Sequence, residues 1–443
     1  MSIARWITTA ATVAVTALAS SPAAAAGGPA AGGTAAGGTA AGGTGRPAGL
    51  TAPGTVTRPV LSRAEAAPFV PANYFGFSGP YAAPVADPWR PAPIREAPPD
   101  FVVGGRGFAT VQEAVNAAFR KGGTKRLYIA IRPGTYTGTV FIPAGTPPLT
   151  IYGIGNPRLA FTVDAIITPA AWAELVNPGG SRYAQGDPAW DMFQSCATRT
   201  STNAGLCATV VWGQSTDLQL KGLTITNTLL DTVDRGTHQA LALRTDADRT
   251  QLEEMHLISR QDTFLANAND VERIARVSVR NSYIEGDTDF VFGRAAAVFD
   301  HTRFHLVSTR KPSGGVIFAP NTAPLYPYGF LVTHSLITAD AGYKAAPTGF
   351  LGRAWDQGAG TTGYLPGVTP NGQLVIRNSL IGEGFTTTAP WAPAATTARP
   401  FTASIEPGRD LNDVNHNRLW EYANLMQPGA TPATTSQGEL RTN

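Results

Sequence analysis

The sequence predicts an all-β protein, a single-stranded right-handed parallel β-helix with one helix covering its N-terminal end. Short β-forming runs alternate with turns, in keeping with 48 glycines and 35 prolines among 443 residues. An apolar pattern then recurs at steps that suit the coils of a solenoid. One amphipathic helix precedes this repeat, and such a helix can close the open end of stacked strands.

The helix is expected within residues 108–119. Thr110 can cap its first turn, and Glu113 stands three residues later, which makes a capping box. Apolar residues follow at helical spacing: Val111, Ala114, Val115 and Ala118. Short strands separated by glycine and proline come next, at residues 127–131, 140–142 and 149–151.

The repeat consists of six related runs in which one apolar residue holds an equivalent place. These residues are Ile225, Leu257, Ile284, Phe304, Ile337 and Ile381. Steps of roughly 20 to 45 residues are expected when loops of different length are inserted between coils. A β-sandwich is the competing architecture, but its hairpins favour tight Asn-Gly or Asp-Gly turns. Asn371-Gly372 is the only such pair, so we favour the β-helix.

The N-terminus has the plan of a secretory signal, assigned to residues 1–26. Arg5 precedes an apolar run too short to span a membrane, and small residues follow it. No cysteine lies near the cleavage region and no later segment is apolar enough to cross a membrane, so we expect a secreted or periplasmic protein. Residues 27–66 are expected to form a Gly/Ala/Thr/Pro-rich linker, 67–427 the β-helix domain and 428–443 a disordered tail.

Charge and cysteine content narrow the partners and the compartment. The net charge of +3 is small for this length, so no nucleic-acid or membrane-surface partner is expected. Cys196 and Cys207 are the only cysteines. In an exported protein we expect them to form one disulfide that closes a short loop. We also expect the protein to be a monomer.

The stretch 283–299 places a carboxylate, Asp289, inside a β-forming run. Because strand side chains alternate, Asp287 and Asp289 are expected on one face, with Phe290 and Phe292 on the opposite, core face. Asp is disfavoured in strands, and two within three residues are unusual. This pattern makes Asp289 a candidate for chemistry if other polar residues join it.

Polar residues from neighbouring coils can join Asp289. Successive coils of a solenoid lie about 4.8 Å apart, so a residue in one coil can touch its equivalents in the next. The candidates are Gln239, Gln261, Asp262 and Asp289, with Arg353 reaching them from a later turn. Of two close carboxylates, one has its pKa raised and can act as a general acid, while the other stays an ionised nucleophile. An arginine would orient the nucleophile, and glutamine amides would stabilise an oxyanion.

Other catalytic and metal-binding patterns are missing from the sequence. No Gly-x-Ser-x-Gly elbow occurs, so a serine hydrolase is not supported. No His-Glu-x-x-His or paired Cys-x-x-Cys motif occurs, so no metal site is implied. The histidines are expected to be solvent-facing or structural, because nothing in the sequence pairs them as ligands. They are His238, His256, His301, His305 and His334.

Several ordered motifs lie between about residues 101 and 422. They include Thr110-Val-Gln-Glu-Ala-Val115, Gln239-Ala-Leu-Ala-Leu243, Gln261-Asp-Thr263, Gly286-Asp-Thr-Asp-Phe-Val-Phe-Gly293 and Leu351-Gly-Arg-Ala-Trp355. Together they resemble the pectinesterases, carbohydrate esterases that demethylate pectin. The long loops are similar to those of a bacterial branch that includes outer-membrane lipoproteins, one of them described as an acyl-CoA thioester hydrolase.

The resemblance implies a right-handed β-helix that needs no cofactor and releases methanol from methyl-esterified galacturonan or its oligomers. It implies that Asp289 is the nucleophile, Asp262 the acid and then the base, and Gln261 the transition-state stabiliser. The implied contacts to the substrate are Gln239, Arg353, Trp355 and Thr209. Two departures stand out: Ala354 where the family often has proline, and Asp287 where plant members often have threonine.

Two other functions compete with pectin demethylation. One is an acyl-CoA thioesterase or another ester hydrolase, and the other is a non-catalytic β-helix that binds cell-wall polysaccharide. Binding alone needs no paired carboxylates. Acyl-CoA would need basic side chains gathered for its phosphates, and no such cluster lies near the motifs. We therefore expect a pectinesterase.

Overall fold

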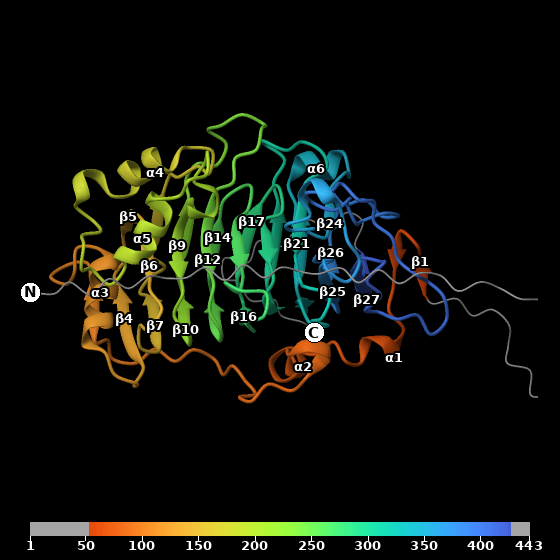
Figure 1. Cartoon of the computed structure of the whole chain (residues 1–443), viewed down its shortest axis with the longest axis horizontal. Coiled ribbons are helices and arrows are strands. Elements are labelled where there is room, and N and C mark those ends of the chain that lie inside the picture. Colours follow the sequence, from red (N-terminus) through yellow and green to blue (C-terminus); the bar gives the residue numbers. More distant parts are fainter. Residues whose placement is uncertain (1–52, 427–443) are drawn as a thin grey trace, which may run out of the picture. The chain divides into compact units, whose positions relative to one another are not determined.

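The computed structural model describes residues 53–426, and this part of the chain forms a parallel β-helix. Three parallel sheets run along the stack of coils, and a complete coil contributes one strand to each sheet (Figure 1). The predicted all-β solenoid is therefore confirmed.

The strands of the described region fall into three long sheets and one short hairpin. The ten-stranded sheet contains β3 (Phe101–Val103), β4 (Leu127–Ile131), β7 (Leu149–Gly153), β10 (Leu218–Lys221), β13 (Thr250–Glu253), β16 (Arg276–Arg280), β19 (Ala296–Asp300), β22 (Phe330–Thr333), β25 (Gln373–Arg377) and β27 (Arg418–Tyr422). The nine-stranded sheet contains β5 (Thr135–Thr137), β8 (Arg158–Phe161), β11 (Thr224–Asn227), β14 (His256–Ile258), β17 (Tyr283–Gly286), β20 (Arg303–Leu306), β23 (Leu336–Ala339), β26 (Leu380–Ile381) and β28 (Leu425–Met426). The seven-stranded sheet contains β6 (Val140–Ile142), β9 (Thr209–Gly213), β12 (Leu241–Thr245), β15 (Phe264–Ala266), β18 (Val291–Gly293), β21 (Val316–Pro320) and β24 (Phe350–Gly352). The hairpin pairs β1 (Gly54–Thr55) with β2 (Arg58–Pro59).

The helices of the described region are short, apart from the one that precedes the repeat. They are α1 (Arg63–Ala66), α2 (Pro71–Gly76), α3 (Val111–Lys121), α4 (Pro169–Val176), α5 (Trp190–Ala197) and α6 (Ala341–Ala345). Four single 3-10 turns accompany them: η1 (Pro80–Ala82), η2 (Pro178–Gly180), η3 (Gly205–Cys207) and η4 (Gly360–Thr362).

Apolar side chains stacked in register fill the interior of the coils. The six residues predicted to be equivalent, from Ile225 to Ile381, pair with one another in consecutive strands of the nine-stranded sheet. Each of them is at most 1% exposed. Because strand residues alternate between two faces, this ladder fixes the register of every coil. The same register sets where the polar residues of the turns meet.

Helix α3 covers the N-terminal end of this core, where it lies against the first strands. The Thr110 hydroxyl accepts a hydrogen bond from the Glu113 amide, and the Glu113 carboxylate accepts one from the Thr110 amide. This is the predicted capping box. The predicted apolar face of the helix is buried in the main core.

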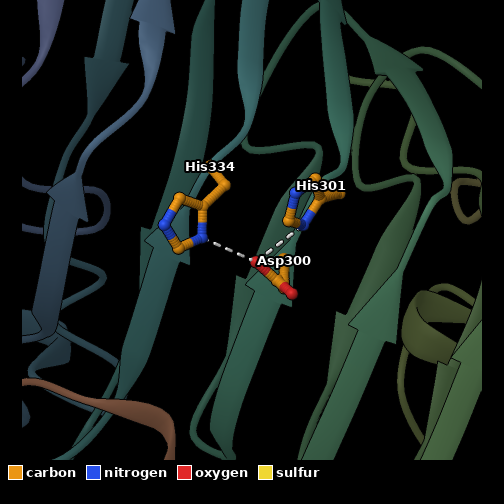
Figure 2. Close-up of side chains that lie close together, drawn as sticks. All are labelled: Asp300, His301 and His334. Carbon is orange, nitrogen blue, oxygen red and sulfur yellow. Dashed lines mark hydrogen bonds and ion pairs between the residues drawn. The ribbon is translucent and has the colours of Figure 1, made fainter. Parts of the chain in front are cut away.

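A left-handed backbone conformation recurs in the turn that leads from the ten-stranded to the nine-stranded sheet. It occurs at Gly222, Glu254, Asn281, His301, His334 and Asn378, with φ between +48° and +61°. Glycine, asparagine, aspartate and histidine tolerate this conformation better than most residues. Two of these side chains, His301 and His334, stack in adjacent coils (Figure 2).

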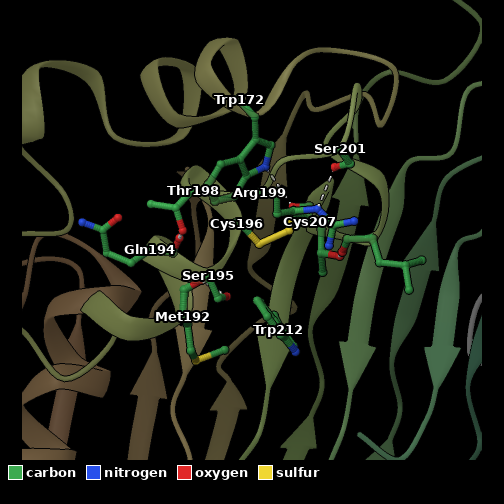
Figure 3. Close-up of a disulfide and its surroundings, with 12 residues drawn as sticks. Trp172, Met192, Gln194, Ser195, Cys196, Thr198, Arg199, Ser201, Cys207 and Trp212 are labelled. Atoms are coloured by element: carbon green, nitrogen blue, oxygen red, sulfur yellow. Dashed lines mark hydrogen bonds between the residues drawn. A yellow bond between two sulfur atoms is a disulfide. The ribbon is translucent and has the colours of Figure 1, made fainter. Parts of the chain in front are cut away.

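A long insertion between β8 and β9 carries α4 and α5 and has an aromatic core of its own. Trp172, Tyr183 and Phe193 are buried there. The disulfide joins Cys196 in α5 to Cys207 in η3, just before β9 (Figure 3), with the two Cα atoms 5.9 Å apart. The predicted pairing is confirmed, and it ties the insertion to the start of a core strand.

The segment just before the predicted domain boundary is folded, contrary to the predicted linker. Within it, Val60 pairs in parallel with Glu421 of β27, and the Leu61 amide donates to the Glu421 carbonyl at 2.8 Å. Arg58 forms an ion pair with the same glutamate at 2.8 Å. Composition misled here because few apolar anchors, such as Leu61, suffice when backbone hydrogen bonds to an edge strand are available.

The predicted signal at 1–26 and the predicted tail at 428–443 lie outside the described residues. Between residues 53 and 426, every helix is too short or too polar to span a bilayer.

Candidate active site

The two candidate carboxylates occupy equivalent turns of successive coils. Asp262 lies between β14 and β15, and Asp289 lies between β17 and β18, 27 residues later (289 − 262). Both have a left-handed backbone, with φ of +65° and +48°. The Asp262 amide donates to the Thr288 carbonyl at 3.0 Å, and Gln261 pairs with Thr288 as an isolated bridge. The register therefore brings the two carboxylates together, as the sequence predicted.

The predicted alternation around Asp289 is wrong. Asp289 lies in a turn, and its left-handed φ breaks the period of two. Phe290 belongs to the interior core, but Phe292 lies in a separate cluster and contacts the Trp355 ring, with centroids 5.8 Å apart. Asp287 is fully buried and does not share an open face with Asp289.

Arg353 holds the Asp289 carboxylate from a later coil. Its Nε donates to Oδ1 at 2.8 Å and its Nη2 donates to Oδ2 at 2.6 Å. Arg353 directly follows β24, which is separated from β18 by β21, so its side chain reaches back across two coils. A bidentate arginine holds a carboxylate in one orientation.

The carboxyl group of Asp262 lies in a different environment. Its residue is 4% exposed, and burial raises the pKa of its carboxyl well above the usual value, with the nearby Asp289 charge acting in the same direction. The Gln239 amide donates to Asp262 Oδ2 at 2.7 Å, which fixes the side chain. The pair therefore combines a proton-bearing carboxyl with an arginine-bound carboxylate, which suits general-acid and nucleophilic roles.

Gln261 has one end of its amide fixed and the other end available. Its Oε1 accepts a hydrogen bond from the His238 amide at 2.9 Å. Among residues 53–426, its nitrogen has no hydrogen-bond partner in the protein. The fixed oxygen determines which way the amide points, so the nitrogen can donate to an oxyanion.

Thr209 and Trp355 differ in their access to a substrate. Thr209 lies at the start of β9, fully buried, and its hydroxyl donates to the Leu206 carbonyl at 2.9 Å. It is thus not placed to contact a substrate directly, in contrast to the prediction. Trp355 is partly buried and packs against the cluster that contains Phe292, two residues after Arg353.

A histidine near the site was missed as a positioning residue by sequence reasoning. His238 lies between two carboxylates, with Nδ1 2.6 Å from Asp164 and Nε2 3.0 Å from Asp234. Burial lowers the pKa of His238, but the hydrogen bonds to the two aspartates outweigh it and raise the pKa above its usual value. These contacts hold the segment whose backbone orients Gln261. Its position next to Gln239 was the one available signal.

Two arginines beside the site were also missed. Arg310 Nε donates to Asp287 Oδ2 at 3.0 Å, and both side chains are almost completely buried. Arg260 contacts Asp231 at 2.7 Å and Glu285 at 2.8 Å. These pairs anchor the loops that follow β11 and β20. No spacing in the sequence marks them, because their partners are set by loop conformation.

Comparison with known proteins identifies the family of this chain. The family model described as Pectinesterase matches residues 195–362, a span that contains every candidate catalytic and substrate-binding residue. The chain is 51% identical over 390 residues to pectinesterase B of Dickeya dadantii, a match that covers 84% of this chain and 90% of that protein. The chain belongs to the pectinesterase family, as its motifs predicted.

Particular relatives of solved structure agree with this. A rice weevil pectin methyl esterase has a TM-score of 0.77 and 38% identity, covering 85% of this chain and 99% of its own. Escherichia coli YbhC has a TM-score of 0.77 and 43% identity, covering 87% and 98%. The curated name of YbhC proposes an acyl-CoA thioester hydrolase activity.

Proposed function

We propose that this protein is a pectin methylesterase, which hydrolyses the methyl ester of galacturonan or its oligomers and releases methanol. One observation carries the proposal. The buried carboxyl of Asp262, whose pKa is raised, lies beside an Asp289 carboxylate held by Arg353. Family membership supplies the kind of ester, and this pair supplies the chemistry.

In the first step, a carboxylate oxygen of Asp289 attacks the carbonyl carbon of the methyl ester. The free amide nitrogen of Gln261 donates to the oxygen on which negative charge develops. Asp262 then gives its proton to the methoxy oxygen as the bond to carbon breaks, and methanol leaves. The product is an anhydride between the galacturonate carbonyl and Asp289.

In the second step, the Asp262 carboxylate takes a proton from water, whose oxygen attacks the same carbonyl carbon. The bond to Asp289 breaks, which frees galacturonic acid and restores the Asp289 carboxylate, and the released acid loses its proton to solvent. Asp262 ends protonated, so the cycle returns to its starting state. The hydrogen bond from Gln239 keeps the Asp262 side chain in place during both transfers.

Trp355 and Arg353 are proposed to bind the sugar. They stand two residues apart after β24, and Trp355 packs beside the site on Phe292. A flat aromatic face suits a pyranose ring, while Arg353 keeps Asp289 aligned with the ester. The proposed steps use only side chains of this chain and water.

The thioesterase alternative is less well supported by the charges around the site. Acyl-CoA carries phosphates that need unpaired basic side chains. Three arginines beside the site are already engaged: Arg353 with Asp289, Arg310 with Asp287, and Arg260 with two carboxylates. None of the three is free to take up a phosphate without breaking an ion pair.

The test is methanol release from methylated oligogalacturonides by the purified protein, with the Asp289→Asn variant beside it. We expect steady release by the wild type and none by the variant, because an amide cannot form the anhydride. Acyl-CoA hydrolysis is assayed in parallel. Rapid hydrolysis of acyl-CoA without methanol release would favour the thioesterase alternative. Methanol release by Asp289→Asn at the wild-type rate would contradict the nucleophile assignment.

Export and a monomeric state remain proposals. The predicted signal at residues 1–26 and the disulfide between Cys196 and Cys207 support secretion or periplasmic residence. N-terminal sequencing of the mature protein tests cleavage near residue 26. Light scattering on the purified protein tests the monomer.

A further inference from the structure

A cluster of one carboxylate and two imidazoles lies outside the site described above. Asp300 Oδ1 lies 3.0 Å from His301 Nδ1 and 3.0 Å from His334 Nδ1 (Figure 2). The three ligand atoms all lie within 4.8 Å of one another. The Thr333 hydroxyl lies 3.2 Å from the same His334 nitrogen. Nothing in the sequence pairs these two histidines, because 33 residues separate them (334 − 301).

The register of the backbone brings these three side chains together. Asp300 ends β19 and pairs in register with Thr333 of β22, so His301 and His334 follow at the same point of adjacent coils. Both have the left-handed conformation of this turn, with φ of +51° and +48°. Their rings stack with centroids 5.3 Å apart and planes 26° apart. The two imidazoles therefore point the same way, with the carboxylate between them.

We propose that Asp300, His301 and His334 bind a divalent transition-metal ion of the Zn²⁺ class. Zinc takes histidine nitrogen and carboxylate oxygen at about 2.0–2.2 Å, so two ligands on one tetrahedral ion lie roughly 3.4 Å apart. The observed spacing of 3.0 Å from the carboxylate oxygen to each nitrogen is close to this, and a small opening of the side chains would admit the ion. Imidazole ligands favour Zn²⁺, Ni²⁺ or Cu²⁺ over Mg²⁺ and Ca²⁺. The side chains are 30%, 39% and 51% exposed, which leaves positions for water on the ion.

The ion would link two adjacent coils and would take no part in ester hydrolysis. The cluster lies in the turn between the ten- and nine-stranded sheets, whereas Asp262 and Asp289 lie in the turn between the nine- and seven-stranded sheets. Binding to the folded state alone would stabilise the pairing of the coils that carry β19 and β22.

The flanking coils supply matched substitutions for the test. Asn281 and Asn378 hold the same left-handed turn position one coil before and one coil after the pair. The variants His301→Asn and His334→Asn thus place a residue that this turn already accommodates, and we expect them to fold. Asp300→Asn removes the carboxylate charge, and His416→Asn is the control, because His416 lies beside Asp413 and outside the cluster.

The experiment is a calorimetric titration of the full chain with Zn²⁺ after EDTA treatment, followed by thermal unfolding with and without Zn²⁺. We expect one Zn²⁺ per wild-type chain and a raised Tm. The His301→Asn/His334→Asn double variant and Asp300→Asn should bind at least tenfold more weakly and show no Tm shift, while His416→Asn behaves like the wild type. Unchanged methanol release by the double variant would agree with a purely structural role for the ion. No Zn²⁺ binding by the wild type, or equal binding by the double variant, would overturn the proposal.

Discussion

At the scale of single residues, the raised pKa of Asp262 lowers the stability of the folded protein at high pH. Its pKa is raised in the folded state, mainly by burial and then by the charge of Asp289. The folded protein therefore holds a proton that the unfolded chain has already released at pH values between the two pKa values. Stability from this group is fully present below about pH 4, the unfolded pKa, and is lost as the pH rises through the folded pKa.

Replacing Asp262 with asparagine should therefore stabilise the protein at neutral and alkaline pH while lowering turnover by at least about 10²-fold, through loss of acid–base help. The amide keeps the shape of the side chain, and its oxygen can still accept the Gln239 hydrogen bond. Thermal unfolding at pH 4 and pH 8 checks this: the gain in Tm should be clear at pH 8 and small at pH 4. An equal gain at both values would contradict the role of the proton.

Turnover should depend on the protonation state of Asp262. Departure of methanol needs Asp262 in its protonated form, so turnover by the wild type should fall as the pH rises through the pKa of Asp262. Initial rates of methanol release across pH 5 to 10 measure this limb. The Asp262→Asn variant is the control, because its residual rate should lack the alkaline decline.

Trp355 tests the substrate contacts at the same scale. Replacement by alanine should raise KM more than it lowers kcat, because mainly uniform binding to the sugar is removed. Methanol release over a range of oligogalacturonide concentrations gives both constants. A fall in kcat with unchanged KM would show that the ring acts on the chemical step instead.

At the scale of elements, the loops around the site depend on buried ion pairs. Arg310 and Asp287 have side chains that are 6% and 0% exposed; Arg310 donates to Asp287 Oδ2, and Asp287 Oδ1 has no hydrogen-bond partner in the described part of the chain. A buried carboxylate without its arginine keeps the desolvation cost and loses the compensation.

Arg310→Leu should lower the free energy of unfolding by about 3–5 kcal/mol, as expected when one partner of a buried pair is removed. Urea denaturation measures the loss. Arg120→Leu is the matched control, because Arg120 is 58% exposed and its ion pair with Asp187 should be worth less than about 1 kcal/mol. Similar losses in the two variants would mean that Arg310 has no special role in anchoring its loop.

Some features of the strands and turns could be predicted from the sequence, and others could not. The apolar ladder from Ile225 to Ile381 was predictable because burial imposes a period on the chain. The joining of Asp262 and Asp289 followed from that register. The left-handed turns at both aspartates did not follow, because alternation alone says nothing about where a strand ends.

The missed features share one physical cause. The Arg310–Asp287 pair and the contact between His301 and His334 depend on which coils are neighbours and how long the intervening loops are. Neither leaves a local pattern. The composition of residues 53–66 predicts a linker, yet Val60 and Leu61 within this stretch pair with β27.

At the scale of the whole described molecule, the disulfide ties an inserted subdomain to the solenoid. Cys196 and Cys207 are 11 residues apart, and closing a loop of that size stabilises a protein by about 3 kcal/mol in the chain-entropy estimate. The double variant Cys196→Ser/Cys207→Ser should lose about this amount.

Thermal unfolding with and without reductant checks the prediction. Reductant should lower the Tm of the wild type toward that of the double variant and leave the variant unchanged. Equal melting of the oxidised wild type and the variant would show that the aromatic core around Trp172 holds the insertion without help.

Segments at the two ends of the stack of coils bear on how copies of the protein associate. An uncovered terminal strand would offer a row of free amides and carbonyls, on which a second copy could grow into a fibre. Helix α3 lies against the core at one end, and at the other end Val60 and Leu61 pair with β27, the last strand of the ten-stranded sheet. We therefore expect this short segment to hinder end-to-end association of copies through the edge of that sheet.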